Sequence, residues 1–83
     1  MPTNKRRRVV SDHWHEIAGS SIILGCGVRE GKLTISFHKR GIPSGTYQYT
    51  TKDLGLCCEM ADHFSAGIFF HQNISYLPYV RVG

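Results

Sequence analysis

Apolar and polar side chains alternate in the segment Leu33-Thr34-Ile35-Ser36-Phe37. This period of two predicts an antiparallel strand with one buried face. The turn-forming segment Arg29-Glu30-Gly31-Lys32 comes directly before it, and the apolar run of residues 22–28 precedes that turn. We therefore expect a β-hairpin at the centre of the fold.

The apolar run contains glycines at positions 25 and 27. In a regular strand, one face carries every second side chain of this run, namely Ile22, Leu24, Cys26 and Val28. The glycines on the other face predict either close packing of the N-terminal segment or a β-bulge.

Two glycines and a proline occur in residues 38–45, which predicts a loop. The next segment, Thr46-Tyr47-Gln48-Tyr49, predicts a third short strand, on which Tyr47 and Tyr49 point to the same side. These tyrosines could stack nucleic-acid bases on an open sheet face, as in single-strand binders. The alternative is that they help to build the core, and the small size of the domain favours burial.

One main helix is expected after the third strand. Thr50 or Thr51 would cap it, and Gly67 would end it. Its buried stripe would consist of Leu54, Cys57, Ala61 and Phe64. The aromatic-rich remainder predicts a helical turn near residues 68–74, followed by an extended segment that packs on the domain, because Pro78 prevents one long helix.

The N-terminal part of the domain is open to two interpretations. Residues 12–18 predict a short helix capped by Ser11, but a strand also fits the segment. Together the elements indicate an α+β fold: a small antiparallel meander of three to four strands, one main helix packed on it, and a C-terminal aromatic-rich segment. With 83 residues, the chain has room for a single small domain, which excludes a multidomain enzyme.

The positive charge is concentrated near the N-terminus. The chain has ten Lys and Arg residues against six Asp and Glu residues, and four of the ten are Lys5, Arg6, Arg7 and Arg8. We expect residues 1–10 to form a flexible basic arm and residues 11–83 to form one domain of balanced charge. Adjacent cations on such an arm can contact successive phosphates of a nucleic acid. An acidic protein surface, or a role in solubility alone, is the alternative.

Four further basic residues bound the second predicted strand and extend the candidate nucleic-acid path: Arg29, Lys32, Lys39 and Arg40. Their two loops fall at opposite ends of a regular strand. They form one patch only if the sheet twists strongly or the longer loop folds over. Acidic residues are expected on the main helix instead, which predicts a bipolar body.

Several short motifs occur in a characteristic order: Ser20-Ser21-Ile22, Tyr47-Gln48-Tyr49, Ser65-Ala66-Gly67-Ile68-Phe69-Phe70, Ile74 with Tyr76, and Pro78-Tyr79. Over residues 20–80 this order resembles the KTSC domain, which occurs at the C-terminus of some lysyl-tRNA synthetases and alone in bacterial and phage proteins. Thr50-Thr51-Lys52-Asp53 stands where that family usually has a Val-Pro turn. The resemblance implies a fold and suspected RNA binding, and it carries over no catalytic residue.

Catalytic and metal-binding patterns are weak in this chain. His13, His15, Cys57 and Cys58 could supply zinc ligands, but adjacent cysteines on a helix point about 100° apart, and no Cys-x₂-Cys pair occurs. Nothing supplies an oxyanion site for a Cys–His pair. We therefore expect no enzyme activity, no metal and no cofactor.

The three cysteines, two of them adjacent, indicate reduced thiols and a cytoplasmic setting, and no apolar run approaches the ~20 residues that span a membrane. The sequence thus predicts a small non-catalytic binding module that contacts nucleic acid, RNA or single strands, through its basic arm. The alternative is a phage-type inhibitor or adaptor that docks on a host protein, such as a nucleic-acid-binding defence complex.

Overall fold

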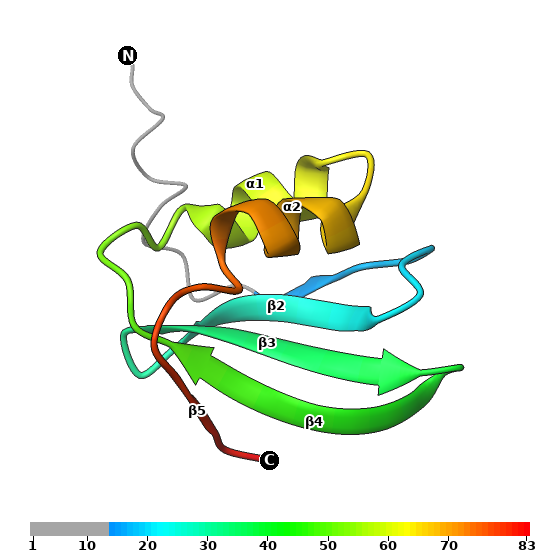
Figure 1. Ribbon diagram of the computed structural model, residues 1–83, viewed down its shortest axis with the longest axis horizontal. Coiled ribbons are helices and arrows are strands. Elements are labelled where there is room, and N and C mark those ends of the chain that lie inside the picture. The colour runs from blue at the N-terminus through cyan, green and yellow to red at the C-terminus, as the bar shows by residue number, and fades with distance from the viewer. Residues whose placement is uncertain (1–13) are drawn as a thin grey trace.

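Residues 14–83 are described by the computed structural model, which shows an α+β fold. The five strands form one antiparallel sheet in the order β1-β2-β3-β4-β5. They are β1 (His15–Glu16), β2 (Ile23–Arg29), β3 (Lys32–Lys39), β4 (Ile42–Tyr49) and β5 (Tyr79–Arg81). The helices α1 (Leu56–Asp62) and α2 (Ala66–Asn73) lie together on one face of the sheet (Figure 1). The predicted meander is confirmed, but it has five strands and two helices where three to four strands and one main helix were expected.

Both hairpins of the sheet close with two-residue turns. Glu30 and Gly31 have φ values of 55° and 73°, and Arg40 and Gly41 have φ values of 55° and 83°. Two successive positive φ values give the turn geometry that matches the twist of paired strands. The loop predicted for residues 38–45 is therefore wrong, because Arg40 and Gly41 alone reverse the chain and β4 begins at Ile42.

An irregularity in β2 changes which residues enter the core. Ile23 pairs with Phe37 and Gly25 pairs with Ser36, so Leu24 is an extra residue at a β-bulge. Ile23 is fully buried, whereas Leu24 is half-buried and lines a different hollow. The predicted common face of Ile22, Leu24, Cys26 and Val28 is wrong for Leu24, since the bulge shifts the alternation by one residue.

The N-terminal segment packs against the glycine face of β2. In the described part of residues 12–18 there is no helix: His15 pairs with Cys26 and Glu16 pairs with Gly25 as strand β1. A Cβ atom at Gly25 would lie 2.7 Å from Trp14 Nε1 and 2.9 Å from the His15 carbonyl oxygen. The strand interpretation is thus confirmed, and the predicted close packing of the N-terminal segment is confirmed at Gly25.

The close contact at Gly25 predicts opposite effects for two glycine substitutions. Gly25→Ala should lower the free energy of unfolding by about 1–3 kcal/mol, because Trp14 and backbone must move. Gly67 lies within α2, and a Cβ there would meet Ile22 at an ordinary 3.7 Å, so Gly67→Ala should raise stability by about 0.5–1 kcal/mol. Chemical denaturation measures the free energy of unfolding of both variants. Equal effects of the same sign would contradict the packing of Trp14 on β2.

Two short helices replace the single one because the chain turns between Asp62 and Ser65. His63 has extended backbone angles, and the Ser65 hydroxyl accepts a hydrogen bond from the Ile68 N–H as the N-cap of α2. Phe64 lies in this turn and is 89% exposed, so its predicted place in the core is wrong. Gly67 is inside α2 and does not end a helix.

The start of α1 also differs from the prediction. Thr51 Oγ1 accepts a hydrogen bond from the Asp53 N–H, and Asp53 Oδ1 accepts one from the Gly55 N–H. These bonds shape the approach to the helix, but its N-cap, Gly55, provides no side-chain hydrogen bond. Thr50 and Thr51 therefore do not cap α1.

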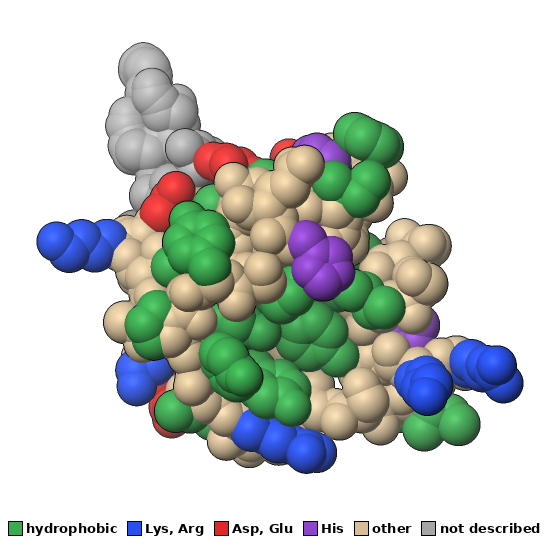
Figure 2. Space-filling model, viewed as in Figure 1, with side chains coloured by type: hydrophobic (Ala, Val, Ile, Leu, Met, Phe, Trp, Pro, Cys, Tyr) green, Lys and Arg blue, Asp and Glu red, His purple; other side chains and the backbone are tan. Residues whose placement is uncertain are grey.

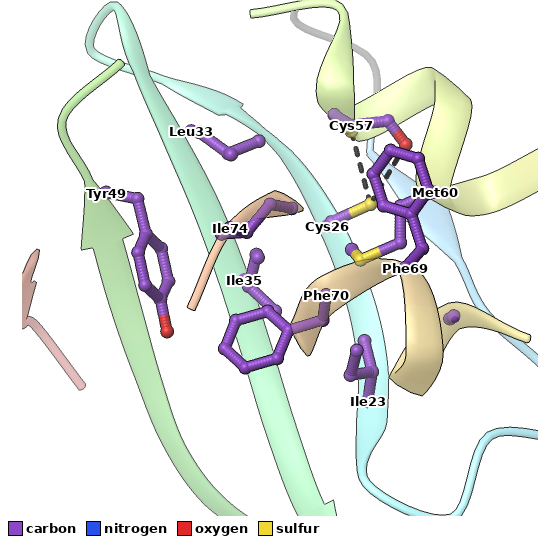
Figure 3. Packing of buried hydrophobic residues seen from close by; sticks show 11 residues of the cluster. Ile23, Cys26, Leu33, Ile35, Tyr49, Cys57, Met60, Phe69, Phe70 and Ile74 are labelled. Atoms are coloured by element: carbon purple, nitrogen blue, oxygen red, sulfur yellow. Dashed lines mark hydrogen bonds between the residues drawn. The ribbon is translucent and has the colours of Figure 1, made fainter. Parts of the chain in front are cut away.

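The core lies between the helices and the sheet (Figure 3). Its fully buried side chains come from β2, β3, α1 and the end of α2: Ile23, Cys26, Leu33, Ile35, Met60 and Ile74. The predicted C-terminal segment does pack back on the domain, since Tyr79 and Arg81 of β5 pair with Tyr49 and Tyr47 of β4. Within residues 14–83, neither helix has the length and apolar character that a membrane span requires.

Candidate functional site

A groove of about 730 Å³ opens between α2 and the strands β3, β4 and β5. Five aromatic side chains line it: Phe37, Tyr47, Tyr49, Phe70 and Tyr79. We call the groove that these five side chains line the aromatic groove. Figure 2 shows apolar side chains gathered in the middle of this face, with Lys and Arg side chains toward its lower and right edges.

The strand register explains why these rings meet. Leu33 pairs with Tyr49 and Ile35 pairs with Tyr47, so both tyrosines lie on the core face of the sheet. Tyr79 of β5 pairs with Tyr49 and adds a third tyrosine to that face. From the other side, α2 supplies Phe70.

Most neighbouring rings in the groove meet edge to face. The ring centroids of Phe37 and Tyr47 are 5.7 Å apart at 79°, and those of Tyr47 and Tyr79 are 5.6 Å apart at 71°. This geometry is favourable for aromatic pairs. Neither neighbour is stacked face to face on Tyr47, and this side chain is half-buried, so part of its surface stays accessible.

The two tyrosines singled out by the sequence have different environments. Tyr49 is 5% exposed and belongs to the core, so it offers no ring face to a ligand, as the burial alternative anticipated. Tyr47 is half-buried on the floor of the groove. Tyr79, which sequence reasoning did not select, is 58% exposed. Its place beside Tyr47 follows from the pairing of β4 with β5. The sequence indicates this pairing only weakly, through the short extended segment after Pro78.

Burial, together with the neighbouring Tyr79 and Tyr47, raises the pKa of Tyr49 to about 12. The unfolded chain therefore loses this proton more readily than the folded chain does. Stability from this group is complete below about pH 10 and is lost as the pH rises toward about 12.

We expect the free energy of unfolding to fall across that pH window and the fall to be smaller in Tyr49→Phe. Denaturation at several pH values, with ultraviolet absorbance of tyrosinate as a second signal, measures both. An identical pH dependence in Tyr49→Phe would contradict the burial of this hydroxyl.

The described lining of the groove is basic and polar. It includes Lys39, His38 and His71, and none of the lining residues among positions 14–83 is Asp or Glu. Arg81 lies beside it on β5 and donates hydrogen bonds to the carbonyl oxygens of Gly83 and Ser44. This distribution favours an anionic ligand with flat apolar parts.

The turn that carries Lys39 and Arg40 is held by a histidine. His38 Nδ1 accepts a hydrogen bond from the Gly41 N–H at 2.8 Å, and His38 Nε2 lies 2.8 Å from the Ser20 carbonyl oxygen. His38 thus ties the β3–β4 turn to the segment before β2. Lys39 and Arg40 are consequently presented at one end of the groove.

The predicted basic path is divided. Arg29 and Lys32 flank the β2–β3 turn, whereas Lys39 and Arg40 lie at the opposite end of the eight-residue strand β3, about 23 Å away by strand rise. The longer loop that could have joined them is a two-residue turn. Arg29 instead lies over the Trp14 ring, with its Cζ atom 4.8 Å from the ring centroid. The Lys5, Arg6, Arg7 and Arg8 cluster lies outside the described residues.

Two of the four candidate zinc ligands, His15 and Cys58, lie next to each other. His15 Nε2 and Cys58 Sγ are 3.5 Å apart, and His13 lies outside the described residues. Between Trp14 and Gly83, no group of three or more His, Cys, Asp or Glu side chains is arranged to hold a metal ion.

Comparison with known proteins gives no match, either to a protein-family model or to a curated protein. The resemblance to the KTSC domain therefore stays a prediction from the sequence motifs.

Proposed function

We propose that this protein is a non-catalytic module that binds single-stranded nucleic acid, RNA or DNA, in the aromatic groove. The proposal is carried by the aromatic groove itself, which Lys39 also lines and to which the described part of the chain contributes no carboxylate. Bases of a single strand offer flat faces for stacking, and its phosphates need cations nearby. The bases of a duplex are already stacked on one another and cannot enter such a groove.

Tyr47 and Tyr79 are the residues that would contact bases. Both line the groove, and both keep part of their ring surface accessible. Their edge-to-face contact holds the two rings in a fixed relation, which lowers the ordering cost on binding. Stacking tolerates any base, so the site would bind with little sequence preference.

Phosphate contacts would come from cations at the groove edge and from the basic arm. On the described surface, Lys39 lines the groove, Arg40 follows it in the β3–β4 turn, and Arg81 hydrogen-bonds to Ser44 of the groove lining. Lys5 to Arg8 are the sequence-predicted contribution. Such contacts position a strand without reading its sequence. Arg29 and Lys32, at the far end of β3, would reach only a longer strand.

The arm can be tested in the full chain by changing Lys5, Arg6, Arg7 and Arg8 to alanine. We expect weaker binding to a labelled oligouridylate and a slope of log affinity against log salt that is flatter by about 3, since each lost contact with a single strand removes roughly 0.7. Fluorescence anisotropy over a salt series measures this. An unchanged slope would remove the arm from the interface, and no binding by the wild-type chain at low salt would overturn the proposed function.

A second function, docking on a host protein as an inhibitor or adaptor, is supported by a different surface. Phe64 is 89% exposed between the helices, and the exposed carboxylates of Glu59 and Asp62 precede it. An apolar side chain beside acidic groups suits a protein partner with a basic rim. Phe64→Ser distinguishes the two functions, because it should leave oligonucleotide binding unchanged. If both functions used one surface, this variant would weaken oligonucleotide binding as well as docking on the protein partner.

A further inference from the structure

Two buried thiols from distant parts of the sequence lie in contact in the core. The sulfur atoms of Cys26, on β2, and Cys57, on α1, are 3.2 Å apart (Figure 3). Cys26 is fully buried and Cys57 is 2% exposed. A disulfide requires a sulfur–sulfur distance of about 2.04 Å, so small side-chain movements would bring the pair to bonding distance.

We propose that Cys26 and Cys57 form a reversible redox modification site, in which a hydroperoxide converts the two thiols into a disulfide that ties β2 to α1. The bond would close a loop from position 26 to position 57 and would join the central hairpin to the helical layer. This site is independent of the aromatic groove and does not rest on nucleic-acid binding.

The two thiols differ in the direction in which their pKa is shifted, and this difference supports a separate role for each. The hydrogen bond with Cys26 lowers the pKa of Cys57, against the effect of its burial, and the positive charge of Arg29 lowers it further. The same hydrogen bond, together with burial, raises the pKa of Cys26. The Cys26 thiol can also donate to the Cys57 carbonyl oxygen at 3.4 Å. Cys57 also lies in the first turn of α1, whereas Cys26 lies within the central strand β2, so we assign Cys57 as the nucleophile and Cys26 as the resolving thiol.

The reaction balances in two steps. The Cys57 thiolate attacks one oxygen of hydrogen peroxide, the O–O bond breaks, and with one proton this gives a sulfenic acid and water. The Cys26 sulfur then attacks the Cys57 sulfur, its proton leaves with the hydroxyl as a second water, and the disulfide forms. Two thiols are oxidised by two electrons and one peroxide is reduced to two waters.

Access of peroxide to the buried pair requires local opening of the first turn of α1. Cys57 lies in the first turn of the seven-residue helix α1, whose N-cap Gly55 gives no side-chain hydrogen bond. Such helix ends open more readily than a buried strand does. The neighbouring Cys58 is half-buried, with its sulfur 3.5 Å from His15 Nε2, and serves as the matched control.

The test uses the full chain carrying Cys58→Ser, treated with hydrogen peroxide and digested with trypsin. Cleavage after Arg8, Arg29, Lys52 and Arg81 places Cys26 in the peptide 9–29 and Cys57 in the peptide 53–81. We expect loss of both free thiols together, one linked pair of these peptides, and a rise in Tm of about 10 °C that a thiol reductant reverses. In wild-type protein, the same linked peptides should form, with Cys58 still free.

The proposal is overturned if Cys57 is oxidised to sulfinic acid while Cys26 stays free. It is also overturned if Cys58→Ser yields only links between separate molecules. Because Cys57→Ala could weaken the core, the test does not depend on that variant. The peptide map of Cys58→Ser alone shows whether the Cys26–Cys57 disulfide forms. Where Cys57→Ala does fold, its Cys26 thiol should resist peroxide.

Discussion

Replacing Tyr47 with alanine is expected to weaken binding of a single-stranded oligonucleotide by about 5- to 150-fold. Loss of one aromatic stacking partner costs roughly 1–3 kcal/mol per base. Tyr47 is the side chain in the aromatic groove that combines a fixed position, through Phe37 and Tyr79, with an accessible ring. Tyr79→Ala should act in the same direction, because its ring completes that surface.

The matched control for this prediction is Tyr76→Ala. Tyr76 is 73% exposed and does not line the groove, so its loss should leave the affinity unchanged. Tyr47→Phe, which keeps the ring, should bind nearly as well as the wild-type chain. Affinities are measured by fluorescence anisotropy at one fixed salt concentration. Equal losses in Tyr47→Ala and Tyr76→Ala, or no loss in either, would count against the groove.

The largest loss of stability is expected from Ile35→Ala. Ile35 is fully buried at the centre of β3, where it pairs with Cys26 of β2 and with Tyr47 of β4. Removing its side chain should cost about 2–5 kcal/mol, because the space left between sheet and helices refills only in part. That is a large share of the stability expected for a domain of this size.

A second isoleucine on the same hairpin provides the control. Ile42, at the start of β4, is 70% exposed, and Ile42→Ala should change the free energy of unfolding by no more than about 0.5 kcal/mol. Urea denaturation of both variants, with the slope m checked for constancy, gives the comparison. Similar losses at the two positions would contradict a core centred on β3.

The sequence predicted the central hairpin well because its signals are local. The alternation around Ile35 and the turn at Glu30 and Gly31 each act over a few residues, and both are present as expected. The resulting register then places Tyr47 and Tyr49 on the core face. This is the part of the candidate site that followed from sequence.

Other features depend on contacts that a local pattern does not contain. The bulge at Leu24 arises from how β2 matches β3, and the two-residue turn at Arg40 and Gly41 replaced a loop that glycine and proline content alone indicated. Phe64 fits a helical stripe by spacing, but Ser65 begins a new helix and turns that ring to solvent. The competing signal, Ser65 as an N-cap, was present in the sequence.

The positions of Tyr79 and of the thiol pair Cys26 and Cys57 also depend on contacts between distant segments, which a local sequence pattern does not contain. Tyr79 enters the groove through the pairing of β5 with β4, across some thirty residues of intervening chain. Cys26 and Cys57 are in contact because α1 packs on β2. From the sequence, the adjacent residues Cys57 and Cys58 were the cysteine pair considered for a site. In both cases the partner is decided by packing between elements.

Nuclear magnetic resonance of the isotope-labelled full chain, titrated with oligouridylate, shows whether the aromatic groove receives single-stranded nucleic acid. We expect the backbone amide shifts to concentrate at the groove, on Phe37, Lys39, Tyr47 and Tyr79, with smaller changes at the β2–β3 turn. Shifts centred on Phe64 and the helical surface, or none at low salt, would contradict binding in the groove.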